Sequence, residues 1–176
     1  MAWNDDDITA LSKGCKKTQH KCYVEFSPIL YTVILKICGQ KENASDLLHD
    51  SFIDIFRSIS SFNSDANFVA WIKRIAMNNT FNSIKRQKTS LRVVTQVESN
   101  DTEDFIEPHS TELDLLLNKL LPEQRMIVWM SVIEQYTHRE IAKITGKSES
   151  YSKSIVSRSL SKLRTLNKVD SYVANK

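Results

Sequence analysis

The spacing of apolar residues between Asn43 and Lys88 constrains the fold of this 176-residue chain more than any other feature. Apolar residues recur there every three or four positions on both sides of a polar loop at 60–67, which predicts two amphipathic helices. The chain has three Gly and three Pro, a composition typical of helices with short connections. We therefore predict an all-α protein with two small helical modules joined by a flexible acidic linker.

Charge divides the chain into three parts. Residues 1–88 carry 12 basic and 9 acidic side chains, residues 89–110 carry 1 and 5, and residues 111–176 carry 11 and 7. We predict helical domains at 1–88 and 111–176, with the linker at 89–110. Two mildly basic modules on an acidic connector are typical of a nucleic-acid binder whose linker does not itself bind the nucleic acid.

The N-terminus, MAWNDDD, has no apolar segment of the kind that a secretory signal needs. The most apolar run, residues 29–38, is interrupted by Lys36 and is shorter than the ~20 residues of a membrane span. We predict a cytoplasmic protein without membrane insertion. Cys15, Cys22 and Cys38 form an odd set without paired spacing, which indicates buried reduced thiols.

Helix boundaries before residue 60 follow from capping residues. A rough helical stripe covers residues 7–26, and Ser27 with Pro28 looks like an N-cap followed by the first helical position. Gly39 is predicted to end that helix, and Asn43 to cap the next one.

The helix after Asn43 has an acidic face as well as an apolar one. Asp46, Asp50 and Asp54 follow one another at intervals of four residues, although like charges at this spacing cost a few tenths of a kcal/mol per pair. Either this face is simply solvated, or it binds a basic surface of a partner.

The next loop and helix combine aromatic, amide and basic side chains. Phe62 lies inside the polar loop, where it either plugs the local core or receives an unstacked base. The helix from Phe68 to about Lys88 carries an outward stripe of Trp71, Arg74, Asn78, Phe81 and Lys85, followed by Arg86. Such a stripe suits a protein that follows a phosphate backbone and stacks on exposed bases. In the alternative reading, the two aromatic residues of this stripe belong to the core.

The second module contains a predicted helix-turn-helix. Thr137 and Glu140 match a capping box, Gly146 supplies a turn and Ser148 can cap a last helix that ends near Lys168. The outward stripe of that helix consists of Ser150, Lys153, Ser154, Ser157, Ser161 and Arg164, with Arg158 at its edge. Small hydroxyls permit close approach to a groove while cations reach phosphates. The alternative is a helical hairpin with a solvated face.

With both modules considered, the chain resembles an extracytoplasmic-function (ECF) sigma factor of bacterial RNA polymerase. The resemblance rests on ASDLLHDSFIDIFRSISSF and FVAWIKRIAMNNTFNSIKR in the first module, and on LPEQRMIVWMSVIEQYTHREIAKITGKSESYSKSIVSRSLSKLR in the second. It implies a non-enzymatic alternative sigma factor, without cofactor or metal. Such a factor binds core RNA polymerase, recognises minus-10 and minus-35 promoter elements and promotes DNA melting. The implied partners are core polymerase, promoter DNA and, as a candidate, an anti-sigma factor.

The resemblance also implies roles for individual residues. Those implied to bind core polymerase are Asp46, Leu47, His49, Asp50 and Phe52. Those implied to bind the single-stranded minus-10 element are Phe62, Asn63, Trp71, Arg74, Asn78, Phe81, Lys85 and Arg86. Those implied to bind the minus-35 duplex are Arg139, Ser150, Lys153, Ser154, Ser157, Arg158 and Arg164. His49 stands where Gln is common in the family, and Ile155 occupies a usually polar or basic position and is predicted to point inward.

Two other classes of function are considered. A helix-turn-helix regulator that binds duplex DNA without polymerase explains residues 122–168, but it leaves the stripe on residues 71–88 without a use. An enzyme is disfavoured because the chain has no Gly-rich phosphate loop, nucleophile elbow or His-Glu metal motif. Cys15, His20 and Cys22 are a weak metal-binding candidate, and core or surface roles explain them better.

Overall fold

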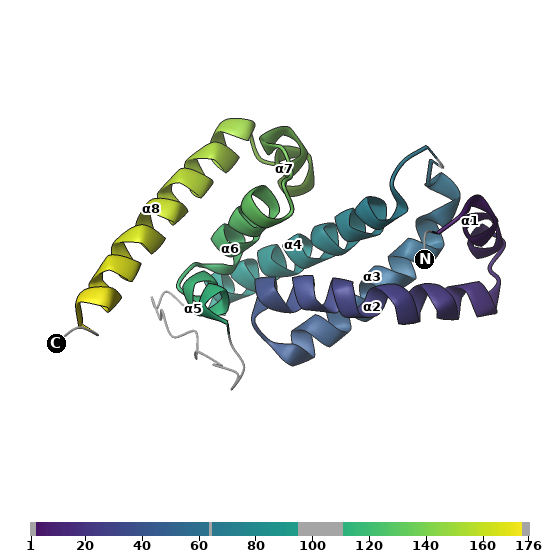
Figure 1. Cartoon of the computed structure of the whole chain (residues 1–176), viewed down its shortest axis with the longest axis horizontal. Coiled ribbons are helices and arrows are strands. Elements are labelled where there is room, and N and C mark those ends of the chain that lie inside the picture. The colour runs from purple at the N-terminus through teal and green to yellow at the C-terminus, as the bar shows by residue number, and fades with distance from the viewer. Residues whose placement is uncertain (1–2, 64, 95–110, 174–176) are drawn as a thin grey trace. The chain divides into compact units, whose positions relative to one another are not determined.

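The computed structural model describes residues 3–63, 65–94 and 111–173. Within these ranges the chain is helical, with short turns and no β-strand (Figure 1). The all-α prediction is confirmed. The elements are α1 (Asp5–Ser12), α2 (Lys16–Cys38), α3 (Lys41–Ser58), the 3₁₀ turn η1 (Ile59–Ser61), α4 (Phe68–Val94), α5 (Glu112–Asn118), α6 (Pro122–Val128), the π-helical turn η2 (Trp129–Ile133), α7 (His138–Thr145) and α8 (Glu149–Val173).

The chain divides into two compact units, which comprise residues Met1–Ser83 and Ile84–Lys176. Helix α4 runs through this boundary and ends at Val94, whereas the sequence predicted an end near Lys88. The rest of the predicted linker, residues 95–110, lies outside the described residues. The domain limits at 88 and 110 therefore stay a prediction.

The core of the first unit forms where the apolar faces of α2, α3 and α4 meet. Leu11 of α1 joins this core, with 1% of its surface exposed. The buried side chains recur every three or four residues along each helix, as amphipathic helices require. They are Leu11, Cys22, Phe26, Leu30, Ile34, Ala44, Leu47, Leu48, Phe52, Ile55, Ile59, Phe68, Ile72 and Ala76.

Pro28 lies inside α2, so the prediction that a new helix begins at Ser27 is wrong. A proline within a helix costs about 3 kcal/mol because it lacks an N–H and its ring crowds the preceding turn. Phe26 and Leu30, on either side of Pro28, are both buried in the same core. This packing keeps the helix continuous until Gly39, which ends it in a left-handed conformation (φ 78°) as predicted.

Two further boundaries differ from the predictions. The helical stripe predicted at residues 7–26 belongs to two helices. Helix α1 ends before a turn at Gly14 (φ 74°), and α2 begins at Lys16. Helix α3 begins at Lys41, earlier than the predicted cap at Asn43, and the Asn43 side chain instead donates through Nδ2 to the Gln40 amide oxygen.

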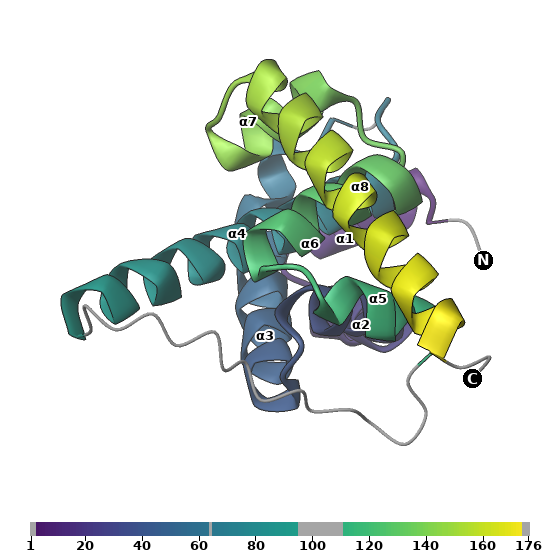
Figure 2. The ribbon, with the colours of Figure 1, turned by 90° about the vertical axis from the view of Figure 1, so that its left-hand side faces the viewer.

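In the second unit, α8 lies against α6 and α7 (Figure 1, Figure 2). Arg125 of α6 is 5% exposed, and its guanidinium donates to the carbonyl oxygens of Leu117 (3.0 Å), Asn118 (3.4 Å) and Leu120 (3.3 Å). These carbonyls lie at and just beyond the end of α5, where helical i+4 donors run out, and the Leu117 oxygen also accepts from the Leu120 N–H at 3.0 Å. Arg125 therefore holds the turn between α5 and α6.

The helix-turn-helix is confirmed at α7 and α8. The Glu140 carboxylate accepts from the Thr137 backbone N–H at 2.8 Å, and the Thr137 hydroxyl accepts from the Glu140 N–H at 3.2 Å, which completes the predicted capping box. Gly146 makes the turn with φ 65°, and the Ser148 hydroxyl accepts from the Tyr151 N–H at 3.1 Å. Helix α8 ends at Val173, later than predicted.

Candidate functional site

One exposed face of α3 carries two carboxylates. Asp46, His49 and Asp50 are all exposed, at intervals that place them on one face of the helix. Ile53, one turn further on, is 47% exposed and continues the same face. Sequence reasoning assigned Ile53 neither a core nor a surface role, although its spacing from Asp46 and Asp50 matches this face. We call Asp46, His49, Asp50 and Ile53 the α3 acidic face.

Leu47 and Phe52 do not lie on this face but in the core of the first unit, and their role in polymerase binding stays a prediction. They are 8% and 3% exposed, and the Phe52 ring packs against Tyr23 with 4.7 Å between ring centroids. Asp54 also turns away from the acidic face, since its carboxylate accepts from Asn79 Nδ2 of α4 at 2.9 Å. Burial of two large apolar side chains and pairing of the third aspartate fix α3 in the core.

An aromatic cluster lies where the loop after η1 meets the start of α4. The Phe62 ring is half-buried and contacts Phe68 (5.4 Å) and Trp71 (5.3 Å) edge to face. Phe62 therefore plugs the local core and still keeps part of its ring accessible. Asn63 is exposed, and its side-chain oxygen accepts from the Asp65 N–H at 3.1 Å.

Most of the predicted α4 stripe is accessible. Trp71 and Asn78 are half-buried, while Arg74, Lys85 and Arg86 are exposed. The stripe therefore offers one large ring, an amide and cations from the same helix.

Phe81 is an exception, and its predicted position on the stripe is wrong. Its ring is 5% exposed, and it lies one helical turn from Met77 and Ile84, which are 1% and 8% exposed. At Phe81 the predicted stripe, whose members are three to four residues apart, borders the buried face of α4. Burial of an aromatic ring contributes about 1.5–3 kcal/mol, which decides the ambiguity in favour of the core.

The outer surface of α8 matches its predicted stripe. Ile155 and Ser159 are 8% and 3% exposed and point inward, as expected. Ser154 is half-buried, and its carbonyl oxygen accepts from Arg158 Nε at 3.3 Å. The exposed members are Ser150, Lys153, Ser157, Arg158, Ser161 and Arg164, and Arg139 of α7 is exposed as well.

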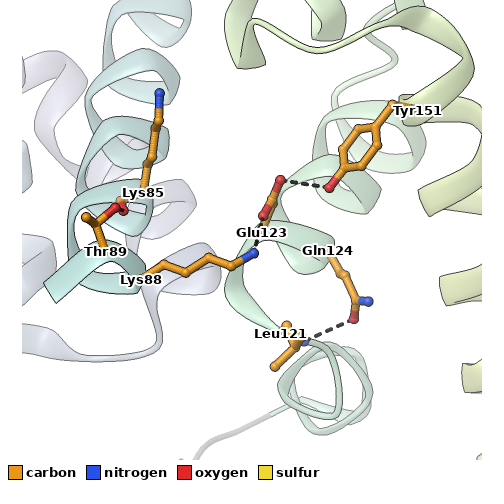
Figure 3. A network of polar contacts seen from close by, with 7 residues as sticks. All are labelled: Lys85, Lys88, Thr89, Leu121, Glu123, Gln124 and Tyr151. Carbon is orange, nitrogen blue, oxygen red and sulfur yellow. Dashed lines mark hydrogen bonds and ion pairs between the residues drawn. The ribbon is translucent and has the colours of Figure 1, made fainter. Parts of the chain in front are cut away.

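Two side chains in the first turn of α8 were missed by sequence reasoning. The Tyr151 hydroxyl donates to one carboxylate oxygen of Glu123 at 2.9 Å, and Lys88 Nζ lies 3.3 Å from the other oxygen (Figure 3). Ser152 is 1% exposed, and its hydroxyl lies 2.9 Å from His138 Nδ1. These contacts tie the start of α8 to α6 and α7. No local pattern reveals them, because the partners lie 28 and 14 residues away in the chain.

Replacing Tyr151 with Phe is expected to lower the free energy of unfolding by about 1 kcal/mol at neutral pH, because one part-buried hydrogen bond is lost. Burial, together with the hydrogen bond to Glu123, raises the pKa of Tyr151 above its ordinary value of 10.0. As the pH rises above 10.0, the Tyr151 hydroxyl therefore loses its proton in the unfolded chain before it does so in the folded protein. The contribution of Tyr151 to the free energy of unfolding falls as a result. Urea denaturation of both proteins at neutral pH and above pH 10.0 measures this. A difference that stays constant across this range would contradict the assignment.

The three cysteines are free thiols, but they do not share one environment. Burial raises the pKa of the Cys22 thiol to about 12, with a smaller contribution from Glu25. Cys15 is exposed, contrary to the prediction of buried thiols, and hydrogen bonds from Thr18 lower its pKa. Among the described residues no three His, Cys, Asp or Glu side chains gather as a metal site would require. Within the same ranges, no helix has the length and apolarity to cross a membrane.

Comparison with known proteins identifies both units. Residues 22–90 match the family model for Sigma-70 region 2, and residues 110–163 match that for Sigma-70, region 4. The chain is 27% identical over 157 residues to the ECF RNA polymerase sigma factor BldN of Streptomyces coelicolor, covering 83% of this chain and 59% of BldN. It is 26% identical over 145 residues to the ECF sigma factor SigE of Mycolicibacterium smegmatis, covering 77% of this chain and 56% of SigE.

The fold is shared with a solved sigma factor structure. The structure of RpoE from Bartonella quintana, solved in complex with the anti-sigma factor NepR, superposes with a TM-score of 0.61 at 21% identity. The match covers 86% of this chain and 97% of RpoE. Two family models in the expected order cover more than half of the chain, on a fold with the matching helices. The chain therefore belongs to the sigma-70 family, and the curated relatives that it matches are ECF sigma factors, which its two helical modules resembled from sequence.

Proposed function

We propose that this chain is an alternative sigma subunit. It binds core RNA polymerase through the α3 acidic face, binds the minus-10 element through the start of α4, and binds the minus-35 element through α8. The observation that carries the proposal is that a region 2 match and a region 4 match occur in one chain, and that each contains an exposed surface of suitable chemistry. A regulator that binds only duplex DNA leaves the exposed stripe on α4 without a use.

At the minus-10 element the protein works by differential binding. Phe62 and Trp71 offer partly exposed rings, Asn63 and Asn78 offer amides that hydrogen-bond base edges, and Arg74 offers a cation. Unstacking and unpairing a base costs a few kcal/mol, and stacking on an aromatic side chain returns about 1–3 kcal/mol per base. Lys85 and Arg86, further along α4, attract the strand through its phosphates. The stacking and base-edge contacts exist only with melted DNA, so they favour the open promoter.

At the minus-35 element the protein reads duplex DNA. Helix α8 presents small hydroxyls, which permit close approach to the major groove, between exposed cations that reach phosphates or base edges. The contacts of Tyr151 and Ser152 hold the first turn of this helix in place beneath its DNA-facing side chains. The apolar Ile155 serves the core and leaves base reading to Lys153, Ser154, Ser157 and Arg158.

In this proposal the chain supplies no catalytic group, and polymerase performs the chemistry in the cytoplasm. An anti-sigma factor is a further proposed partner, supported by the fold shared with RpoE, which was solved bound to NepR. The test of the whole proposal is gel filtration of the full chain with bacterial core RNA polymerase. Co-elution supports a sigma subunit, whereas well-folded protein that does not bind polymerase would favour the duplex-binding regulator.

Replacing Lys153 or Arg158 with Ala is expected to weaken binding to the minus-35 duplex by about 1–3 kcal/mol where the lost contact is to a base edge. If the contact is to phosphate, the plot of log affinity against log salt concentration should have a slope that is shallower by about one. Fluorescence anisotropy across salt concentrations measures both quantities, using duplex DNA selected by the wild-type protein from a random pool. Lys13→Ala, an exposed cation of the first unit, is the matched control. Unchanged affinity in both α8 variants would indicate a merely solvated face.

A further inference from the structure

Trp3, which precedes α1, packs its indole ring into the first unit beside the aromatic cluster. Its ring lies nearly parallel to that of Phe68, with centroids 5.0 Å apart and an interplanar angle of 14°. It also contacts the Phe26 ring of α2 at 5.4 Å. The segment before α1 thus places an aromatic side chain directly against the first residue of α4.

Polar contacts from α1 and α2 hold this indole in one orientation. Its Nε1–H donates to the Glu25 carboxylate at 2.9 Å. Lys21 Nζ lies 5.2 Å from the indole centroid, and the same ammonium pairs with Asp7 at 2.7 Å. A cation over the ring and an acceptor at its nitrogen restrict the indole more tightly than apolar packing alone.

Phe68 connects Trp3 to the two rings proposed to meet bases. It is 6% exposed, so it offers almost no surface to DNA itself. Its ring contacts Phe62 edge to face at 5.4 Å and Trp71 at 5.9 Å with an interplanar angle of 26°. A change in the position of Phe68 therefore moves both accessible rings, and Trp3 supports Phe68 directly.

We propose that Trp3 is a positioning residue for single-stranded DNA recognition. By stacking on Phe68, Trp3 fixes the geometry of the Phe62–Trp71 pair before DNA binds, so that less conformational freedom is lost on binding. The inference rests on the proposed function, because it assumes that this pair contacts unpaired bases. It adds a residue outside the matched region 2 segment, which begins at residue 22.

Two substitutions of Trp3 separate positioning from simple core filling. Trp3→Leu keeps an apolar side chain but loses the ring face, whereas Trp3→Phe keeps a ring that can stack. Ile8→Ala is the control, since Ile8 of α1 packs against the same core without belonging to the aromatic cluster. Each full-length variant is assembled with core polymerase and assayed at a temperature at which circular dichroism shows it folded.

The probe is a fluorescent single-stranded DNA selected by the wild-type holoenzyme from a random pool, compared with a scrambled oligonucleotide. Trp3→Leu should lower the ratio of selected to scrambled affinity by roughly two- to tenfold, the size expected for one lost aromatic pair. Trp3→Phe should restore most of that ratio, and Ile8→Ala should leave it unchanged. A wild-type ratio in Trp3→Leu, or an equal fall in Ile8→Ala, would overturn the inference. Failure of wild-type protein to bind polymerase would instead overturn the proposed function.

Discussion

Replacing Asp46 and Asp50 together with Lys is expected to abolish co-elution with core RNA polymerase. Both carboxylates are exposed on one face of α3, and neither is needed by the core of the first unit. Close charge pairs at interfaces contribute about 1.5 kcal/mol or more each, so the loss of two lowers affinity by roughly a hundredfold or more. Charge reversal adds repulsion from a basic partner surface. Gel filtration of each variant with core polymerase measures the effect.

The matched control carries Asp6→Lys and Glu112→Lys. These two exposed acids lie on α1 and α5, and their replacement changes the net charge by the same amount. The control should co-elute with polymerase as wild type does. If both double variants bind equally well, the α3 acidic face is merely solvated. If both fail, the effect comes from net charge rather than from a docking surface.

Replacing Trp71 with Ala is expected to weaken binding of the holoenzyme to single-stranded minus-10 DNA by roughly five- to hundredfold. This range corresponds to the 1–3 kcal/mol that stacking of one base on an aromatic ring contributes. The indole is half-buried against Phe62 and Phe68, so part of its surface is available to a base. Affinity for closed duplex should change much less, because paired bases do not reach the ring.

A core role for Trp71 makes a different prediction, and Ile75→Ala tests it. Ile75 follows Trp71 by one helical turn and packs partly buried against the same core, but it has no ring. Both substitutions should lower the free energy of unfolding, and only Trp71→Ala should reduce single-strand binding selectively. Equal losses of single-strand and duplex binding in Trp71→Ala would contradict the base-stacking role. The measurement is fluorescence anisotropy with DNA selected by the wild-type holoenzyme.

Local features of the chain were sufficient to predict the helix-turn-helix and the exposed polar surface of α8. The capping box at Thr137 and Glu140 and the turn at Gly146 depend on residues within a few positions of one another, and both are present. The exposed stripe of α8 also follows from helical spacing, because polar side chains that recur with the helix period remain in water unless something covers them.

Tertiary packing decided which apolar residues face the core and which polar residues pair. By spacing alone, Phe81 could lie on the exposed or the buried face of α4, and burial of its ring placed it inside. Pro28 stays within α2 because Phe26 and Leu30, two residues away on either side, are both buried in the core. The stacking of Trp3 on Phe68 and the Tyr151–Glu123 hydrogen bond join residues 65 and 28 positions apart. Helical periodicity carries no information about such distant partners, since only the folded core brings their side chains into contact.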